Sequence, residues 1–588
     1  MDIFDALSMV GGLALLLYGM HVMGDSLEKL SGGRLEKILE QMTSRRIKAV
    51  LLGALVTAAI QSSSATTVMV VGFVNSGIMK LGQAVGIIMG ANIGTTITSW
   101  ILSLSGLEGN GLVQFLKPTS LSPILAVIGV AFLMFSKNEK KKNLGSIFLG
   151  FAVLMFGMDV MSTAVSGLAE LEGFKNILLM FTNPILGMIA GMLLTAIIQS
   201  SSASIGILQA FCASGLVTYG AVIPIVMGQN IGTCVTAILS SIGASKNAKR
   251  AAAVHLYFNV IGTMVFMLVF YTLNALFHFA FLDGMASAAN IALIHSFFNV
   301  GATVLLFPFA NVLERLALLT IRDKGAEEPA VAKEFKLLDV RFLETPGFAI
   351  EQCKNVTIDM AEKAREALFI GIEILTDYDE SRAKRVVELE SMVDRYEDEL
   401  GAYLVKLSSR NLSTKESHAV TKILHCIGDF ERISDHALNL MDAAKEMHEK
   451  RLSFSGKATE ELAVFTRAIK DIVNITIEVF ETEDVRKATS VEPLEEVIDN
   501  LNQKIKNRHV KRLQNGECTI ELGFILSDIC TNYERVSDHC SNIAVCIIQM
   551  QTDGLGAHGY LDNVKSENNE EFRNEYQEDK KHYVLPEQ

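Results

Sequence analysis

The sequence is poor in proline, tryptophan and charge for its length. It contains 9 prolines and one tryptophan among 588 residues, and only 20% of the residues are Asp, Glu, Lys or Arg. Acidic residues outnumber basic residues by 65 to 52, so the chain lacks the basic surface that nucleic-acid binding requires. The eight cysteines include no CxxC pair and no zinc-like spacing. We therefore exclude a disulfide scaffold and expect reduced packing cysteines.

Two other signals are missing from the sequence. No nucleophile–base constellation and no nucleotide-binding loop emerges, which argues against an enzyme. Asp2 and Asp5 stand where a secretory signal has basic residues, and no small-residue cleavage site follows. We therefore expect the first apolar segment to remain in the protein as a membrane span.

Charge is distributed unevenly along the chain. Residues 1–320 contain 17 Lys/Arg and 13 Asp/Glu, whereas residues 321–588 contain 35 and 52. This contrast predicts one domain in lipid and another in water. We expect a transmembrane transport domain at 1–320, a linker at 321–345, a cytosolic helical domain at 346–551 and a charged tail at 552–588.

Apolar segments define the expected all-α membrane architecture. Seven approach the roughly 20 helical residues that cross a bilayer: 7–24, 82–105, 121–136, 144–168, 219–243, 252–277 and 286–312. Two more segments, 48–80 and 183–217, are each interrupted midway by a Gln and three Ser. Their arms are too short to span singly, so we expect re-entrant helical hairpins whose turns face protein or a water-filled cavity.

An internal repeat relates the two interrupted segments. At a shift of 138 residues, TAAIQSSSA at 57–65 superposes on TAIIQSSSA at 195–203, and GANIGTTIT at 90–98 superposes on GQNIGTCVT at 228–236. Over this stretch 20 of 42 positions are identical. The agreement without a gap indicates a duplication.

Basic residues orient the two repeats, which we place at about 10–101 and 148–239. They cluster at 34–48, 137–142, 246–250, Arg315 and Arg322. The positive-inside rule assigns all of these clusters to the cytoplasm. The repeats then cross the membrane in opposite directions, with the N-terminus outside and the C-terminal domain in the cytoplasm. Inverted repeats are typical of alternating-access transporters with a site near the midplane.

The Gln-Ser-Ser-Ser boxes supply the expected substrate site. A turn that opens into a helix offers free backbone N–H groups, and the serines add neutral donors, which suits an oxyanion that must be released again. The alternative is that the serines only let helices pack closely. The expected substrate-binding residues are Gln61, Ser62, Ser63, Ser64, Gln199, Ser200, Ser201, Ser202, Asn92 and Asn230.

Threonines and histidines give further candidates beside the boxes. The pairs Thr95 with Thr98 and Thr233 with Thr236 each share one helix face, where hydroxyls can complete a cation shell or bond back to a helix carbonyl. Two His-x-x-x-Asn pairs lie on the late spans, and interhelical hydrogen bonding is their favoured use. These pairs are His255 with Asn259 and His295 with Asn299.

The cytosolic part contains its own repeat. ERISDHALNL at 431–440 matches ERVSDHCSNI at 534–543 at a shift of 103 residues. Carboxylates at a spacing of four share a helix face, and two such faces packed together favour a hard or borderline divalent metal. Solvated helix faces produce the same spacing, so this alternative stays open. The candidate pairs are Glu390 with Asp394, Glu431 with Asp435, Glu495 with Asp499, and Glu534 with Asp538.

With its two intact boxes, the membrane part resembles the type II sodium/phosphate cotransporters over about residues 10–310. The resemblance implies hairpin tips that bind phosphate, with sodium as coupling ion. It associates the second box and the Asn-Ile-Gly-Thr-x-x-Thr segment with sodium, which points here to Gln199, Ser200, Thr233 and Thr236, with Thr95 and Thr98 as repeat counterparts.

Residues 345–550 resemble PhoU-like domains, which implies two three-helix repeats with metal on the acidic pairs; iron, zinc, manganese and magnesium are all candidates. Together the resemblances imply a sodium-dependent inorganic phosphate symporter of the bacterial inner membrane, regulated by the PhoU-like domain, with lipid and a possible cytosolic regulatory protein as partners. A phosphate exporter and a phosphate-sensing receptor without transport are the alternatives. The sequence gives neither transport direction nor sodium stoichiometry.

Overall fold

The computed structural model describes residues 3–31, 45–106, 118–166, 172–212, 215–322, 333–549 and 570–587. Throughout this described part the secondary structure is helical apart from one isolated bridge between Thr218 and Met285. The chain divides into two compact units. The first unit comprises Met1–Val331 and Asp339–Phe348, and the second unit comprises Ala332–Leu338 and Ala349–Gln588.

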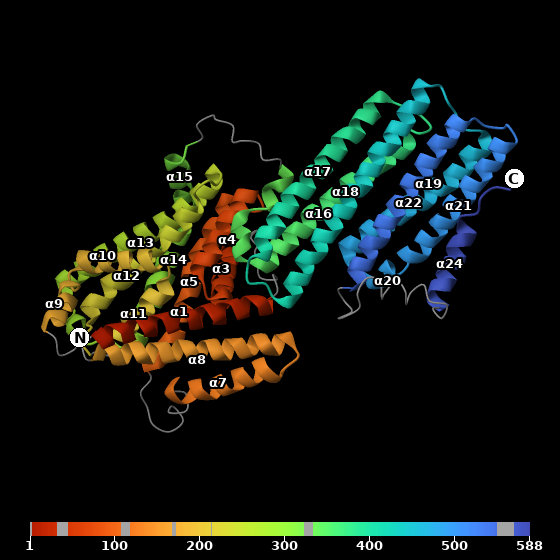
Figure 1. The fold of residues 1–588 in the computed structure, drawn as a ribbon. Helices are drawn as coiled ribbons and strands as arrows, with labels where there is room; N and C mark the ends of the chain where they lie inside the picture. Colours follow the sequence, from red (N-terminus) through yellow and green to blue (C-terminus); the bar gives the residue numbers. More distant parts are fainter. Residues whose placement is uncertain are drawn as a thin grey trace. The chain divides into compact units, whose positions relative to one another are not determined.

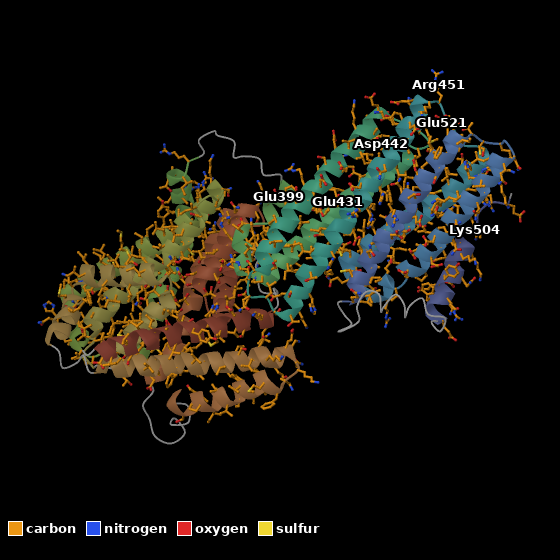
Figure 2. All side chains as sticks on the ribbon, in the orientation of Figure 1. Glu399, Glu431, Asp442, Arg451, Lys504 and Glu521 are labelled. Atoms are coloured by element: carbon orange, nitrogen blue, oxygen red, sulfur yellow. The ribbon has the colours of Figure 1, made fainter. Side chains whose placement is uncertain are left out.

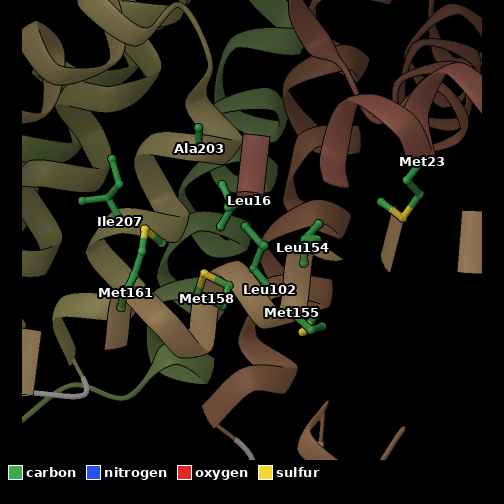
Figure 3. Packing of buried hydrophobic residues seen from close by; sticks show 10 residues of the cluster. Leu16, Met23, Leu102, Leu154, Met155, Met158, Met161, Ala203 and Ile207 are labelled. Carbon is green, nitrogen blue, oxygen red and sulfur yellow. The ribbon is translucent and has the colours of Figure 1, made fainter. Parts of the chain in front are cut away.

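The first unit contains two long helices that run side by side. These are α1 (Ile3–Ser31) and α8 (Glu139–Ser166), with α7 (Pro118–Phe135) packed against α8 (Figure 1). Leu16, Leu154 and Met158 are fully buried at this contact, where Leu102 and Ala203 join them (Figure 3). The contact ties the repeat elements described next to one apolar core.

Two helix–turn–helix pairs occupy the positions of the interrupted segments. The first is α3 (Arg46–Ile60) with α4 (Ser63–Ser76), and the second is α10 (Pro184–Ile198) with α11 (Ser201–Cys212). Each pair is followed by a long helix, α5 (Leu81–Ser103) in the first repeat and α12 (Tyr219–Ser240) in the second. The helices of each pair have 12 to 15 residues, which is short for a membrane span.

Glycines hold the first helix of each pair directly on the backbone of the long helix. In the first repeat a Cβ on Gly53, Gly90 or Gly94 would lie 2.2, 2.0 or 2.5 Å from the carbonyl oxygen of Ile87, Val50 or Ala54. In the second repeat a Cβ on Gly191, Gly228 or Gly232 would lie 2.1, 1.9 or 2.5 Å from the carbonyl oxygen of Ile225, Met188 or Met192. Every one of these contacts recurs at the 138-residue shift, so the duplicated sequence builds duplicated packing.

The remaining helices of the first unit are α9 (Glu172–Met180), α13 (Lys246–Phe277), α14 (Ala288–Leu306) and α15 (Ala310–Thr320). Among the described residues, six helical segments are long and apolar enough to cross a membrane: Phe4–Leu30, Leu81–Gly106, Glu139–Val165, Tyr219–Ser240, Lys246–Phe277 and Ala288–Thr320. The expected seventh span, 121–136, corresponds to α7, whose apolar stretch Ser120–Phe135 is shorter than these six. Large apolar side chains such as Phe135, Ile197 and Leu268 are 72% to 82% exposed, as lipid contact requires.

The second unit is a bundle of long amphipathic helices. Its main helices are α16 (Pro346–Glu373), α17 (Glu380–Ser408), α18 (Thr414–Glu449), α19 (Gly456–Thr482), α21 (Val491–Gln514) and α22 (Ile520–Gln549). A one-turn helix, α20 (Val485–Ala488), precedes α21, and α24 (Glu570–His582) packs on α21. Between α18 and α22 a pseudo-symmetric pair of bonds recurs at the 103-residue shift: His539 Nδ1 lies 2.9 Å from Asp429 Oδ1, and His436 Nδ1 lies 2.8 Å from Asn532 Oδ1.

The boundaries expected from the sequence do not coincide fully with the two units. Residues 323–332 of the expected linker, 550–551 of the expected helical domain and 552–569 of the expected tail lie outside the described residues, as do 34–44 of the first basic cluster. The described part of the linker is folded into short 3-10 helices, η5 (Lys333–Leu337) and η6 (Val340–Glu344). Asp339–Phe348 belongs to the first unit.

Candidate functional site

Both Gln-Ser-Ser-Ser boxes form the turn of a helix–turn–helix pair. Gln61 and Gln199 end α3 and α10 in the left-handed conformation, with φ of 60° and 58°, and their N–H groups bond to Thr57 O and Thr195 O. These φ values are uncommon for residues other than glycine, and such strain tends to occur at functional sites. The two turns therefore have the same backbone geometry, as the repeat predicts.

The serines cap the second helix of each pair. Ser62 Oγ accepts a hydrogen bond from Ala65 N at 3.1 Å, and Ser200 Oγ accepts one from Ala203 N at 3.2 Å. The amides at the start of α4 and α11 have no intrahelical acceptor, and the helix dipole favours an anion there. Ser63, Ser201 and Ser202 are buried, whereas Ser64 is half-buried.

The four candidate threonines differ in what their hydroxyl groups bond to. Thr95 Oγ1 donates to Ala91 O, and Thr233 Oγ1 donates to Gln229 O, both at 3.0 Å, so these hydroxyls bond back to their own helix. Thr98 Oγ1 instead donates to Gln61 Oε1 at 2.9 Å, which joins the first box to α5. Thr236 Oγ1 is buried and has no hydrogen-bond partner within the described part of the chain.

Polar side chains on α13 and α14 connect to both repeats. Asn92 Nδ2 donates to Asn259 Oδ1 at 3.2 Å, and Asn259 Nδ2 lies 3.4 Å from Cys234 Sγ. Ser99 Oγ is hydrogen-bonded to His295 Nδ1 at 2.7 Å. Asn259 and His295 thus make the expected interhelical bonds, and Asn259 fixes α13 between α5 and α12. Asn299 Nδ2 instead donates to His295 O on its own helix, and His255 Nδ1 has no partner among the described residues.

Several buried polar atoms near the second box lack a partner among the described residues. Besides Thr236 Oγ1 they include Thr195 Oγ1, Gln229 Oε1 and Asn230 Nδ2. A buried polar group without a partner is costly, so these atoms are candidates for contact with an ion or a substrate. Sequence reasoning missed Thr195 and Gln229. Gln229 takes the place of Ala91 in the first repeat, and this gain of a polar side chain inside a span is the signal that could have identified it.

The second arms bring the repeats together. Helix α4 packs on α12, and α11 packs on α5, so each arm contacts the long helix of the other repeat. The first unit also contains a cavity of about 980 Å³, lined by Asp159, Gln209 and Ser287 among others, but by none of the box residues. The two turns form the candidate site, and this cavity lies apart from the box residues.

Among the described residues of the second unit, six carboxylates form two clusters of three. Asp394, Glu397 and Glu431 place carboxylate oxygens within 4.8 Å of one another, as do Glu495, Asp499 and Asp538. Glu431, labelled in Figure 2, lies on α18. Oxygen donors at this density suit a hard divalent cation, so these residues fit the expected metal. Glu397 was missed because it lies three residues from Asp394 and not four.

The other expected ligands lie beside these clusters. Burial, followed by the carboxylates of Asp394 and Asp435, raises the pKa of Glu390. Burial, followed by Asp435 and Glu397, raises the pKa of Glu431 to about 7. Glu390 and Asp435 therefore contribute to the negative charge of the first cluster. Glu534 Oε2 instead accepts a hydrogen bond from Asn502 Nδ2 at 2.6 Å.

Comparison with known protein families assigns both units. The sequence profile of the Na+/Pi-cotransporter family matches residues 15–163 and 154–289, and that of the PhoU domain matches 357–444 and 465–547. YqeW of Bacillus subtilis (strain 168), an uncharacterised protein, is 30% identical over 322 residues, which cover 54% of this chain and 100% of YqeW. The chain belongs to the Na+/Pi-cotransporter family. It is therefore a membrane transporter with helical spans and a PhoU-type helical bundle, and not an enzyme.

Two further relatives of this Na+/Pi-cotransporter family member differ in how much they share. YjbB of Escherichia coli (strain K12), described as a candidate inorganic phosphate export protein, is 24% identical over 563 residues, which cover 94% of this chain and 99% of YjbB. The human sodium-dependent phosphate transport protein 2B is 36% identical over 138 residues, or 21% of this chain and 20% of the human protein. The full-length likeness thus includes the second unit, whereas the human likeness is confined to a short segment.

Proposed function

We propose that this chain transports inorganic phosphate across the cell membrane and that net flow is outward. The observation that carries the proposal is the pair of left-handed Gln turns, each followed by a serine-capped helix N-terminus, at equivalent positions of a duplicated membrane unit. Backbone amides and neutral hydroxyls bind a phosphate oxygen without the strong hold of a fixed Lys or Arg, which favours release.

In the proposed mechanism the two helix–turn–helix pairs are re-entrant hairpins of inverted repeats. Phosphate binds between the turns, where the amides of α4 and α11 and the hydroxyls of Ser63, Ser64, Ser201 and Ser202 donate to its oxygens. Movement of one repeat against the other then changes the side from which the turns are reached. The N-terminus lies outside and the PhoU-like unit lies in the cytoplasm, as the basic clusters favour.

Outward flow is favoured by the relative that matches over almost its whole length. YjbB shares both units with this chain and is described as a candidate exporter. Uptake driven by sodium, the main expectation from the sequence, draws on a likeness to the human protein that covers 21% of this chain. Sodium-coupled uptake is therefore the second candidate function, because an inward sodium gradient drives a symporter inward. Its ligands would be Thr236, Gln199 and Ser200, with Gln229 added.

The PhoU-like unit is proposed to regulate the flux from the cytosol. Its two carboxylate clusters would hold a divalent cation, which neutralises charges that otherwise repel one another. Binding of this cation favours the ionised carboxylates and therefore one arrangement of the helices that carry them. A cytosolic regulatory protein or the phosphate level would act on the same unit.

Phosphate flux in membrane vesicles of both orientations tests the proposal. We expect radiolabelled phosphate to accumulate in inside-out vesicles that contain the chain and to enter right-side-out vesicles more slowly. Sodium-driven accumulation in right-side-out vesicles would instead restore the symporter. Binding of phosphate without flux in either orientation would replace the transporter with a receptor.

A further inference from the structure

The segment Asp339–Phe348, which we call the clamp, lies in the first unit although the sequence predicts a linker there. Its middle forms η6, and Asp339 caps this short helix by accepting a hydrogen bond from Arg341 N at 2.9 Å. Phe342 and Phe348 are 0% and 2% exposed. The clamp is therefore a packed element of the membrane unit and not a free tether.

A buried ion pair fastens the clamp to three helix ends. Arg341 Nη1 lies 2.7 Å from Asp339 Oδ2, and the two side chains are only 10% and 2% exposed. Asn75, near the end of α4, donates from Nδ2 to Asp339 Oδ2 at 2.6 Å and accepts from Ser245 N at 2.8 Å. Arg341 Nε donates to Ser240 O at the end of α12 at 2.8 Å. Because a buried charge without its partner is costly, these contacts oppose separation of the clamp from the helix ends.

Aromatic packing fastens the clamp to α4 a second time. The rings of Phe73, Phe342 and Phe348 pack with centroids 4.8 to 5.5 Å apart in every pairing. A Cβ on Gly72 would lie 2.7 Å from Phe342 Cε1, so the ring rests directly on the α4 backbone. The same end of α4 thus holds the clamp by both polar and apolar contacts.

The residues on either side of the clamp belong to the second unit. Phe335 packs edge-on against Tyr396 at 4.9 Å, and Arg395 lies 5.5 Å from the Phe335 ring. Leu338 belongs to the second unit and Asp339 to the first, and the boundary is crossed again between Phe348 and Ala349. This second crossing falls inside the first turn of α16, which continues without a break to Glu373.

These contacts connect the first Gln-Ser-Ser-Ser box, through α4 and the clamp, to the first turn of α16. Helix α4 begins at Ser63 beside the box and ends at Ser76 beside the clamp, so its 14 residues form one stiff rod. Displacement of its box end moves Phe73 and Asn75, and with them the first turn of α16. The coupling also acts in reverse, because a free-energy coupling between two sites is reciprocal.

We propose that the clamp is the mechanical coupling through which the PhoU-like unit controls the first hairpin. A change in the first carboxylate cluster shifts α18, which packs closely on α16, because a Cβ on Gly371 would lie only 2.9 Å from Ala437 O. The clamp then passes the shift to α4 and to the box at its start. The control of flux rests on the proposed transport function, whereas the coupling itself does not.

A double-mutant cycle on the full-length protein tests the coupling. The change in the second unit is Glu431→Gln with Asp435→Asn, which removes charge from the first carboxylate cluster. The change in the clamp is Asp339→Ala with Arg341→Ala. Hydrogen exchange of the α4 amides is measured in reconstituted protein for all four combinations, together with phosphate flux. Lys384→Gln, which breaks an exposed ion pair with Glu380 within α17 of the second unit, is the matched control.

With the clamp intact, we expect the second-unit change to alter α4 exchange and phosphate flux by about 5-fold or more, the lower bound of typical allosteric couplings. With the clamp broken, we expect both effects to vanish, while Lys384→Gln changes neither quantity in either background. An equal effect in both backgrounds, or no effect on α4 with the clamp intact, overturns the proposal. If no variant transports phosphate, the transport function fails, and hydrogen exchange still decides the coupling. Phe342→Leu and Asn75→Ala replace the double clamp variant if it does not fold.

Discussion

Thr98 donates a 2.9 Å hydrogen bond to Gln61 Oε1, whereas the equivalent pair in the second repeat is not joined in this way. Thr236 Oγ1 is buried without a partner among the described residues, and Gln199 is exposed. The two repeats thus share a backbone but differ in how the box is held. Alternating access needs such a difference, because two identical halves would open both sides together.

The first prediction concerns the unpartnered hydroxyl. Thr236→Val keeps the side-chain shape but removes an oxygen ligand, so we expect the apparent sodium affinity of phosphate flux to fall about 10-fold, as loss of one charge-assisted contact implies. Thr98→Val is the matched change in the other repeat. It should leave sodium affinity unchanged, because the Thr98 hydroxyl is already bonded to Gln61. Equal sodium affinities for both variants and the parent protein would remove Thr236 from the sodium site.

The second prediction concerns the serines that cap the hairpin arms. Ser62→Ala or Ser200→Ala removes a helix cap beside the proposed phosphate site, and each should lower phosphate flux about 3- to 30-fold, since the loss of an N-cap destabilises the start of the phosphate-binding helix by roughly 0.5–2 kcal/mol. Ser76→Ala at the other end of α4 removes a hydroxyl that bonds to Gly72 O at 3.0 Å and should have little effect on flux. Unaltered flux in both box variants would exclude these hydroxyls from the mechanism.

The third prediction concerns the glycine contacts. Gly228→Ala places a Cβ 1.9 Å from Met188 O, a clash with backbone that no rotamer can relieve. We expect destabilisation of about 3 kcal/mol or more, seen as loss of folded protein after extraction in mild detergent. Gly401→Ala on α17 meets no atom within 4 Å, so it should stabilise its helix by about 0.5–1 kcal/mol. Wild-type yield and thermal stability of Gly228→Ala would show that α10 and α12 can separate.

The fourth prediction is a pH dependence in the second unit. Burial and neighbouring carboxylates raise the pKa of Glu431 from 4.5 to about 7. The folded state therefore holds this proton more tightly, and its contribution to stability is complete below the unfolded-state pKa and is lost as pH rises through about 7. Without divalent cation, the unfolding temperature of this unit, followed by circular dichroism, should fall as pH rises across this range.

Two controls separate this effect from others. Glu431→Gln cannot titrate and should flatten the pH dependence. A divalent cation such as Mn²⁺ should restore stability at the alkaline end and do little at the acidic end, because metal binding requires ionised carboxylates. A profile that is the same for Glu431→Gln and the parent protein would assign the dependence to other groups.

Much of the membrane site is readable from the sequence because it is local. A Gln and three Ser in the middle of an apolar run predict a turn flanked by short helices, and the turns at Gln61 and Gln199 fall at these positions. The roles of the box residues as ligands stay predictions. The hydrogen-bond partner of each threonine was not predictable. Thr95 and Thr98 share one helix face, and only the position of Gln61 in the folded protein gives Thr98 a different acceptor from Thr95.

The clamp could not be predicted because it depends on contacts between residues that are far apart in the sequence. Asp339 and Arg341 stand in a charged stretch and look like surface residues, and only the structure reveals their burial. The sequence predicted the second carboxylate cluster better than the clamp, because three of the four residues expected there lie together in it. Glu534 lies outside the cluster, and its carboxylate accepts a hydrogen bond from Asn502 on a different helix.

The glycine contacts also determine which parts of the first unit can change their distance from one another. Since Gly90 and Gly228 leave no side chain between helices, α3 on α5 and α10 on α12 can only travel as single bodies. The freedom that a carrier needs is therefore concentrated in two dihedral angles at each left-handed glutamine. Gln61 and Gln199 would then serve as hinges of the transporter as well as part of its binding site.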